Sequence, residues 1–359
     1  MNPKNILLIK SHSMGIGDLL RGSAAWRVLK TKWPDAQLHF LMLSNHAGYP
    51  SEALIRSHYL LSSVHFVTVK RGQPGTQKQH SLPLAQVFQA VSQCVSKQAI
   101  DLVIDFESSG LKTSWLTRRI AKEKQAVSVG IAQFPLRRLF YDRAAPSSRH
   151  YQALHGLSRA MDYTERDFVA LAALGIERAG ARITLRPSAE GATWMQQHPI
   201  QTPGKKTLVL NIGCGTDDAL VKRPPLEQLA ECCAALYERT PFALHLSGAP
   251  FERDVNQQFV ALLKGKLQAN GHQATIVDWA GQLSLDQLSG LLQQADMVIS
   301  SDSGPYHMAV GLGVPTLCWF NFSTPPSYHH HADVVCLVEP SAAAFAASAQ
   351  RLLSCNSGE

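Results

Sequence analysis

The sequence predicts an α/β protein built from two doubly wound, Rossmann-like domains. Short runs rich in Val, Ile and Leu alternate with longer amphipathic stretches, as strands and crossover helices do around a parallel sheet. The chain has 359 residues, which suits two domains of ordinary size. The strand-like runs also fall into two series, one in each half of the chain. Together these observations favour two separate α/β domains.

The first series occupies the N-terminal half. Its expected strands are Asn5–Lys10, Gln37–Leu43, Val64–Val69, Asp101–Phe106 and Ala126–Ile131. The second series occupies the C-terminal half. Its expected strands are Thr207–Ile212, Phe242–Gly248, Ala274–Gly281, Asp296–Ser301, Pro315–Phe320 and Val334–Pro340. Because helical stretches separate many of these runs, we expect mainly parallel sheets.

Two helices of the second half are predicted by local signals. The first follows Pro225, which suits the first turn of a helix. Its apolar residues recur at helical spacing and are Leu226, Leu229, Cys233 and Leu236. In the second, Ser284 and Gln287 form a capping box before a leucine-rich stretch.

A segment that mixes Pro, Gly and charged residues separates the two series. We expect the boundary near Pro199 to Lys206, with an N-terminal domain at 1–200 and a C-terminal domain at 201–359. Doubly wound domains bind ligands beside the carboxyl ends of their strands. The two domains are therefore expected to face one another across a central cleft.

Composition excludes several classes of protein. With 45% apolar and 17% charged residues, the chain is too hydrophobic to be disordered. The longest apolar runs, such as Val314–Phe320, are far shorter than the ~20 residues that cross a bilayer. The N-terminus lacks the apolar segment of a secretory signal, so we expect a cytoplasmic protein. Seven cysteines without a CxxC pair predict neither disulfides nor zinc.

The first informative motif is GIGDLLRGSAAW, which follows the strand Asn5–Lys10. Gly15 and Gly17 leave room for a ligand, and the amides of a helix N-terminus attract anions. The motif is not the dinucleotide fingerprint GxGxxG, because Leu20 stands where the third glycine would be. Asp18 is either a helix cap or a functional acid at the start of this helix.

The second motif is DSGPYHMAVGLGVP, which follows the strand Asp296–Ser301. A helix is expected to start at Pro305, since proline at the first helical position loses no hydrogen bond. The amides around Ser303 and Gly304 would then point towards a phosphate. Taken alone, the segment could also be an ordinary strand, turn and helix with Asp302 as a cap.

Both motifs together resemble the two signatures of glycosyltransferase family 9, the ADP-heptose:lipopolysaccharide heptosyltransferases. In that family a GD turn opens a helix in the N-terminal half, and D[ST]GxxHLAxxLGxP occurs in the C-terminal half. DLVIDFESSGLKTSWL and LHLSGAPFERDV are further parallels, and the resemblance covers roughly residues 5–320. It implies a GT-B fold and an inverting transfer that needs neither a metal nor another cofactor, since the ADP-sugar is a substrate.

The resemblance also implies roles for individual residues. Asp18 matches the general base that takes the proton from the acceptor hydroxyl. Lys222 matches the lysine that neutralises the departing diphosphate. The donor-binding residues that it implies are Gly17, Thr216, Leu283, Asp302, Ser303, Gly304, Pro305 and His307.

Positive charge is concentrated between Lys112 and Arg149, where nine bases and two acids give an excess equal to the formal net charge of +7. The lipopolysaccharide inner core carries carboxylates and phosphates at a membrane surface. We therefore expect four of these bases to bind the acceptor, with contact to anionic lipid at the inner face of the inner membrane as a second use. The four are Arg118, Arg119, Arg137 and Arg138. The alternative is an ordinary solvated face; no nucleic-acid motif is present.

These inferences predict an inverting, metal-independent enzyme that moves heptose from ADP-heptose to the lipopolysaccharide inner core of Gram-negative bacteria. One alternative is the same fold with another nucleotide-sugar donor or glycan acceptor. Another is a non-catalytic protein that binds a nucleotide sugar. The run His329, His330 and His331 lacks the spacing of a preformed metal site, so no metal is expected there and its role is left open.

Overall fold

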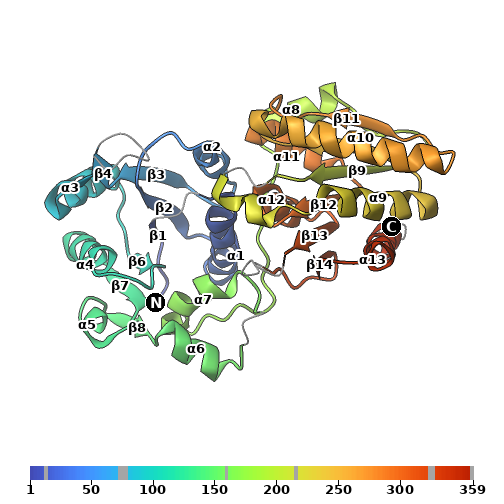
Figure 1. The fold of residues 1–359 in the computed structure, drawn as a ribbon. Coiled ribbons are helices and arrows are strands. Elements are labelled where there is room, and N and C mark those ends of the chain that lie inside the picture. Colours follow the sequence, from blue (N-terminus) through green and yellow to red (C-terminus); the bar gives the residue numbers. More distant parts are fainter. Residues whose placement is uncertain (12–14, 72–79, 158–160, 214–216, 322–327, 356–359) are drawn as a thin grey trace. The chain divides into compact units, whose positions relative to one another are not determined.

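The structure, a computed structural model, describes residues 1–11, 15–71, 80–157, 161–213, 217–321 and 328–355 (Figure 1). The chain divides into two compact units, Met1–Ile183 (unit 1) and Thr184–Glu359 (unit 2). This division lies before the boundary expected at residue 200, because α8 (Ala189–Gln197) packs against α11 (Leu285–Gln293). The segment 184–200 therefore belongs to unit 2, not to the N-terminal domain 1–200.

Unit 1 contains a parallel six-stranded sheet in the order β3-β2-β1-β6-β7-β8. Its strands are β1 (Asn5–Ser11), β2 (Gln37–Ser44), β3 (Ser63–Thr68), β6 (Leu102–Asp105), β7 (Val127–Ile131) and β8 (Arg143–Ala145). A short hairpin joins β4 (Lys70–Arg71) to β5 (His80–Ser81). Its helices are α1 (Ile16–Lys32), α2 (Ser51–Arg56), α3 (Leu84–Cys94), α4 (Lys112–Lys124), α5 (Pro135–Arg138), α6 (Ser148–Leu154) and α7 (Glu165–Leu171).

Unit 2 repeats this topology with a second parallel sheet in the order β11-β10-β9-β12-β13-β14. Its strands are β9 (Lys206–Asn211), β10 (Phe242–Ser247), β11 (Thr275–Asp278), β12 (Met297–Ser301), β13 (Thr316–Phe320) and β14 (Val334–Val338). Besides α8 and α11, its helices are α9 (Leu226–Arg239), α10 (Arg253–Ala269), α12 (Gly304–Leu312) and α13 (Ala342–Cys355). The predicted α/β class with parallel sheets is confirmed in both halves.

The two predicted helices of unit 2 are present. Pro225 is the residue that precedes the first turn of α9, with non-helical backbone angles, and so stands one position earlier than expected. The capping box of α11 is confirmed: Ser284 Oγ accepts a hydrogen bond from the Gln287 amide at 3.1 Å. The Ser284 amide in turn donates to Gln287 Oε1 at 3.0 Å.

In each sheet the strand order reverses beside the first strand, between β1 and β6 in unit 1 and between β9 and β12 in unit 2. Crossover connections leave on opposite sides at this point, which opens a crevice at the carboxyl ends of the strands. The segments that carry Asp18 and Asp302 follow β1 and β12 directly. The topology therefore places both predicted motifs where doubly wound folds bind ligands.

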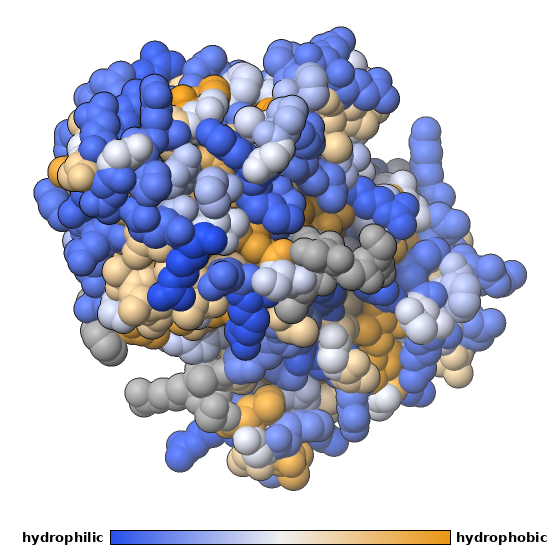
Figure 2. Space-filling view, turned by 90° about the vertical axis from the view of Figure 1, so that its right-hand side faces the viewer, coloured by the Kyte–Doolittle hydropathy of each residue, from blue (hydrophilic) through white to orange (hydrophobic). Residues whose placement is uncertain are grey.

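Apolar side chains are concentrated inside the two units. Core clusters are formed by buried residues such as Leu7, Ile9 and Val103 in unit 1 and Leu208, Phe259 and Trp319 in unit 2. On the face shown in Figure 2, hydrophilic residues predominate and apolar residues form small areas. Among the described residues, no helix has both the length and the apolar character required to cross a membrane.

A glycine in β7 provides a test of the packing in unit 1. A Cβ added at Gly130 would lie 2.3 Å from the ring of Tyr141, whereas one added at Gly265 in α10 meets no atom within 4 Å. Gly130→Ala should therefore lower the free energy of unfolding by about 1–3 kcal/mol through overpacking. Gly265→Ala should raise it by about 0.5–1 kcal/mol through helix propensity. Urea unfolding of both variants measures the difference, and equal stabilities would contradict the packing described here.

Candidate active site

Asp18 lies in the first turn of α1, and its carboxylate is held by two side chains. Tyr163 donates a hydrogen bond from its hydroxyl to Asp18 Oδ1 at 2.6 Å. Arg21 donates to the same oxygen from Nη1 at 3.1 Å. The N-cap residue of α1 is Gly15, and the helix has no side-chain cap. Asp18 is therefore not the helix cap of the simpler interpretation but a partly exposed carboxylate in a fixed orientation.

A buried ion-pair network supports this carboxylate. Lys10 Nζ lies 2.9 Å from Asp167 Oδ2, and Arg21 Nε lies 3.2 Å from Asp167 Oδ1. Lys10 also donates to the backbone carbonyl of Asp18 at 3.0 Å. The side chains of Lys10 and Asp167 are only 5% and 1% exposed. Two cations thus meet two carboxylates, so the buried charges of Lys10 and Asp167 are balanced within the network.

The pKa shifts in this network follow from burial and from neighbouring charge. Burial by itself would raise the pKa of Asp167, but Arg21 and Lys10 lower it below its usual value. Burial lowers the pKa of Lys10, against the opposing effect of Asp167. Burial also raises the pKa of Tyr163, so its hydroxyl stays protonated and donates to Asp18.

Two adjoining hollows lie in unit 1 at the carboxyl ends of its strands. A pocket of about 200 Å³, here called the Asp18 pocket, is lined by Lys10, Ser11, Asp18, Leu19, Arg21, Met42 and Glu107. A larger cleft of about 380 Å³, here called the α6–α7 cleft, shares Arg21 and Glu107 with it. The Ser11 amide donates to Glu107 Oε1 at 2.8 Å and joins the ends of β1 and β6. Because the two hollows share Arg21 and Glu107, a molecule in the α6–α7 cleft would lie close to the pocket that Asp18 lines.

The lining of the α6–α7 cleft combines apolar surfaces with hydrogen-bonding groups. The apolar and aromatic members are Phe106, Tyr151, Met161 and Val169, and the polar members include Glu107, Ser108, Ser148, Gln152 and Arg166. Arg166 is exposed, packs over the ring of Tyr163 and has no carboxylate partner among the described residues. Flat apolar surfaces flanked by hydroxyl and amide groups suit a sugar, and Arg166 would favour one that carries a negative charge.

In unit 2 the second motif brings Lys222 and Asp302 together. Lys222 Nζ lies 2.9 Å from Asp302 Oδ2 and 3.3 Å from the carbonyl of the same residue. The lysine side chain is 33% exposed, whereas that of Asp302 is 3% exposed. Asp302 is therefore the counter-ion that positions Lys222, a role that the sequence does not predict. The alternative role of Asp302 as a helix cap is not observed, because Ser303 occupies the N-cap position of α12.

The beginning of α12 has the expected shape of an anion-binding turn. Gly304 and Pro305 form its first helical positions and are partly exposed, and of the two only Gly304 carries an amide hydrogen. The Ser303 hydroxyl accepts a hydrogen bond from Asn211 Nδ2 at 3.0 Å and donates to the Ser301 carbonyl. The Ser303 side chain therefore stabilises the turn through internal hydrogen bonds. A ligand at this turn would contact the backbone and not the Ser303 hydroxyl.

The other predicted donor-binding residues lie in different places. Gly17 is buried in the first turn of α1 in unit 1, and Leu283 is half-buried before α11 in unit 2. His307 is buried, with Nδ1 3.0 Å from His329 Nε2 and Nε2 3.9 Å from Asp302 Oδ1. Thr216 lies outside the described residues. The donor-binding roles of these residues stay predictions.

The four arginines expected to bind the acceptor have different environments. Arg137 is fully buried and bonds to Asp105, Tyr141 and several backbone carbonyls, so it is a structural residue and not an acceptor ligand. Arg118 forms an ion pair with Asp142. Arg119 is exposed and packs over Phe88 and Trp115. Arg138 is exposed. None of the four lines the Asp18 pocket or the α6–α7 cleft, as those hollows are formed by the described residues.

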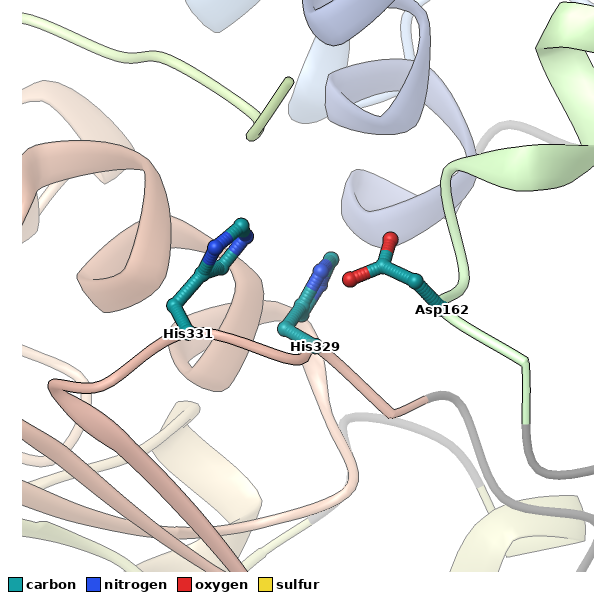
Figure 3. A group of neighbouring side chains, drawn as sticks. All are labelled: Asp162, His329 and His331. Atoms are coloured by element: carbon teal, nitrogen blue, oxygen red, sulfur yellow. The ribbon is translucent and has the colours of Figure 1, made fainter. Parts of the chain in front are cut away.

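The histidine run lies between β13 and β14. His329 and His331, both labelled in Figure 3, have nearly parallel rings whose centroids are 6.3 Å apart. The backbone amide of His329 donates to the Tyr306 hydroxyl at 3.1 Å. His329 therefore links the run to His307 and to α12, which gives at least this member of the run a part in shaping the second motif.

The site contains residues that the sequence did not reveal. Tyr163, Asp167 and Arg166 come from α7 and the segment before it, about 145 residues after Asp18, and no short motif marks them. The position of Lys10, a charged residue at the end of the apolar strand β1, was the one available signal. Glu252 is a further buried carboxylate, which accepts from the Ala249 amide at the carboxyl end of β10.

Doubly wound units with polar side chains at the carboxyl ends of their strands define a class of proteins that bind nucleotides and their reaction partners. Residues 88–349 match the family described as glycosyltransferase family 9 (heptosyltransferase). The chain therefore belongs to this family and is a glycosyltransferase. The matched range includes Lys222 and Asp302 and leaves Asp18 outside it. A comparison with curated protein sequences found no match.

Solved structures share the fold over the whole chain. A glycosyltransferase family 9 protein of Veillonella parvula is 17% identical with a TM-score of 0.69, and 98% of each chain is covered. The E. coli ADP-heptose lps heptosyltransferase II is 15% identical with a TM-score of 0.63, covering 98% and 99% of the two chains. The E. coli heptosyltransferase WaaC with ADP-2-deoxy-2-fluoro heptose is 19% identical with a TM-score of 0.63, covering 98% and 100%.

The buried network predicts a large effect of Asp167→Asn on stability. The substitution leaves Lys10 and Arg21 buried without their shared counter-charge, which should cost about 3–5 kcal/mol of unfolding free energy. Arg56→Ala is a suitable control because Arg56 forms an exposed ion pair with Glu52. Urea unfolding of both variants measures the difference, and a loss below about 1 kcal/mol for Asp167→Asn would contradict the network's role.

The same carboxylate predicts a dependence of stability on pH. The pKa of Asp167 is lower in the folded protein than its usual value of 3.8. Its contribution is therefore fully present above that value and is lost as the pH falls through the lowered pKa. Asp167→Asn should remove this part of the acid destabilisation, so the two proteins should differ less in acid than at neutral pH. A difference that is constant over this range would argue against the assignment.

Proposed function

We propose that this glycosyltransferase transfers heptose, with inversion and without a metal, from ADP-heptose to the lipopolysaccharide inner core. The observation that carries the proposal is the carboxylate of Asp18, held by Tyr163 and Arg21 beside a cleft of unit 1. Membership of glycosyltransferase family 9 supports the donor class, and a family structure contains ADP-2-deoxy-2-fluoro heptose.

In the proposed reaction, Asp18 removes the proton from an acceptor hydroxyl. The hydroxyl oxygen then forms a bond to the anomeric carbon of the donor while the bond from that carbon to the diphosphate oxygen breaks. ADP departs with the electron pair of that bond, and attack opposite to it inverts the anomeric configuration. Tyr163 and Arg21 keep the carboxylate oriented for this step, because both donate hydrogen bonds to Oδ1.

The leaving diphosphate needs positive charge, which unit 2 supplies in two ways. Lys222 is partly exposed, and the N-terminus of α12 carries the positive end of a helix dipole. These groups stabilise negative charge that increases as the bond to ADP breaks. A metal ion would supply the same stabilisation in other transferases, so this arrangement supports a reaction that proceeds without one.

The α6–α7 cleft is the proposed place for the acceptor. Its apolar surfaces and polar groups suit a sugar, and Arg166 would pair with a carboxylate or phosphate of the inner core. This assignment replaces Arg137, which is buried. An acceptor of this kind is attached to lipid, so the proposed reaction takes place at the inner face of the inner membrane.

Direct assay tests the function. The protein is incubated with ADP-heptose and a heptose-free lipopolysaccharide, and mass spectrometry should show one added heptose, with activity that survives EDTA. UDP- and GDP-sugars serve as competing donors. Transfer of another sugar in preference to heptose would support the alternative donor, and tight ADP-heptose binding without turnover would support a non-catalytic binding protein.

Asp18 and Tyr163 predict a graded loss of turnover. Asp18→Asn should lower kcat by about 10²-fold or more, because the amide cannot accept the proton. Tyr163→Phe should lower kcat by a smaller factor, about tenfold, since the carboxylate loses one of the two hydrogen bonds that orient it. Tyr59→Phe, at an exposed site, is the control. A wild-type kcat for Tyr163→Phe would contradict the orienting role assigned to its hydroxyl.

Lys222 and Arg166 should separate donor binding from acceptor binding. Lys222→Ala should weaken ADP binding and lower turnover, because the diphosphate loses its cationic partner. Arg166→Ala should raise the acceptor KM about tenfold and leave ADP affinity unchanged. Arg119→Ala serves as the control, since Arg119 is exposed and outside both hollows. Each variant is titrated with ADP and with acceptor. Weaker binding of the same ligand by both variants would contradict the assignment of ADP to Lys222 and of the acceptor to Arg166.

A further inference from the structure

Helix α5 and the residues around it present apolar side chains to solvent and keep a charged one inside. Leu136 is 50% exposed and Leu139 is 74% exposed, and the preceding Phe134 is 37% exposed. Arg137, between the two leucines, is fully buried. This is the reverse of the usual arrangement in water, where leucine is buried and arginine is exposed.

Arg137 fixes this arrangement because its guanidinium group has many partners. Nε donates to the carbonyl of Ile131, and Nη1 and Nη2 donate to the carbonyls of Ser109, Gly110 and Glu107. Nη2 also contacts Asp105 and the Tyr141 hydroxyl. These contacts tie α5 to the loop after β6, so the helix cannot rotate to bury its leucines without breaking them. The exposed leucines are therefore a fixed feature of the surface.

The apolar residues are accompanied by positive charge. Arg138 follows the buried arginine and is exposed, as are Arg143 at the start of β8 and Arg149 in α6. The Ser148 amide donates to Gln133 Oε1 at 2.9 Å, which holds the start of α6 beside the residue that precedes Phe134. The acid of this segment, Asp142, is already paired with Arg118. Among the residues that the structure describes, Arg138, Arg143 and Arg149 form no ion pair, so the surface combines apolar side chains with unneutralised arginines.

We propose that Phe134, Leu136 and Leu139, together with Arg138 and Arg149, form a docking surface for an anionic phospholipid bilayer. The apolar side chains would enter the boundary between headgroups and acyl chains, and the arginines would pair with lipid phosphates. Neither contribution is large alone, but stable attachment of a peripheral protein requires two such signals together.

Charge decides between a bilayer and a second copy of this chain as the occupant. In a symmetric pair the same surface would face itself, which would bring the arginines of both copies together. An anionic membrane instead supplies the opposite charge. Figure 1 shows α5 beside β8 at the end of the unit 1 sheet. The helix follows β7, whose carboxyl end lies at the same edge of the sheet as the segment that carries Asp18.

Vesicle sedimentation tests the proposal independently of any transfer reaction. The full-length protein should sediment with vesicles of phosphatidylcholine and phosphatidylglycerol, and much less with phosphatidylcholine alone. The double variant Leu136→Ser/Leu139→Ser should lower the partition coefficient about tenfold or more, and Arg138→Glu should weaken both binding and its salt dependence. Tyr59→Ser is the matched control, because Tyr59 is 42% exposed and precedes β3 at the opposite edge of the sheet.

Two further measurements keep the result unambiguous. Thermal unfolding should be nearly unchanged in the double variant, since both leucines are exposed, and the fluorescence of Leu139→Trp should shift to shorter wavelength with anionic vesicles. Equal sedimentation of the double variant and the wild type would overturn the proposal. So would light scattering that shows a dimer broken by the double variant, with vesicle binding unaffected. Because binding needs no turnover, a failed transfer assay leaves this result standing.

Discussion

The shared contact of Lys10 and Arg21 with Asp167 is the interaction on which the site in unit 1 depends. It joins the end of β1 and the first turns of α1, which are consecutive in the chain, to the first turn of α7, which follows much later in the sequence. Each charge is buried at a considerable desolvation cost, and only the complete set offsets that cost. Arg21 also donates a hydrogen bond to Asp18, so the ion pair between Arg21 and Asp167 helps to fix the orientation of the Asp18 carboxylate. Stability and the proposed chemistry therefore depend on the same side chains.

The strands could be predicted because each is an apolar run bounded by turn residues, and every predicted strand is present. The edge strand β8 could not be predicted, since Arg-Ala-Ala has neither the length nor the β-branched residues of a strand signal. In the candidate site, Asp18, Lys222 and Asp302 were identifiable from local motifs. Tyr163 and Asp167 were not, because their importance arises only when α7 packs beside α1, which no local pattern encodes.

Arg137 shows why counting charge along a sequence is a poor guide to a surface. In the window of basic residues it is indistinguishable from Arg138, its immediate neighbour. In the structure the guanidinium of Arg137 donates hydrogen bonds to buried backbone carbonyls. Arg138, in contrast, is exposed to solvent. A guanidinium can be buried when its five donors find acceptors, and the loop after β6 supplies them. The buried carbonyls of the loop after β6 therefore decide which side chains of α5 are buried and which face solvent; the composition of the helix does not.

The pairing of Lys222 with Asp302 has a consequence for turnover. Lys222 carries its own counter-ion, so in the proposed reaction a diphosphate at this lysine would replace Asp302 instead of meeting an unneutralised cation. The free energy of that exchange is smaller than the full attraction between lysine and diphosphate. In the proposed reaction, Asp302 would take the place of the departing ADP, and the lysine would regain a partner. An internal competitor of this kind would limit inhibition by the proposed product, because the nucleotide would leave a lysine that is paired again and not an isolated charge.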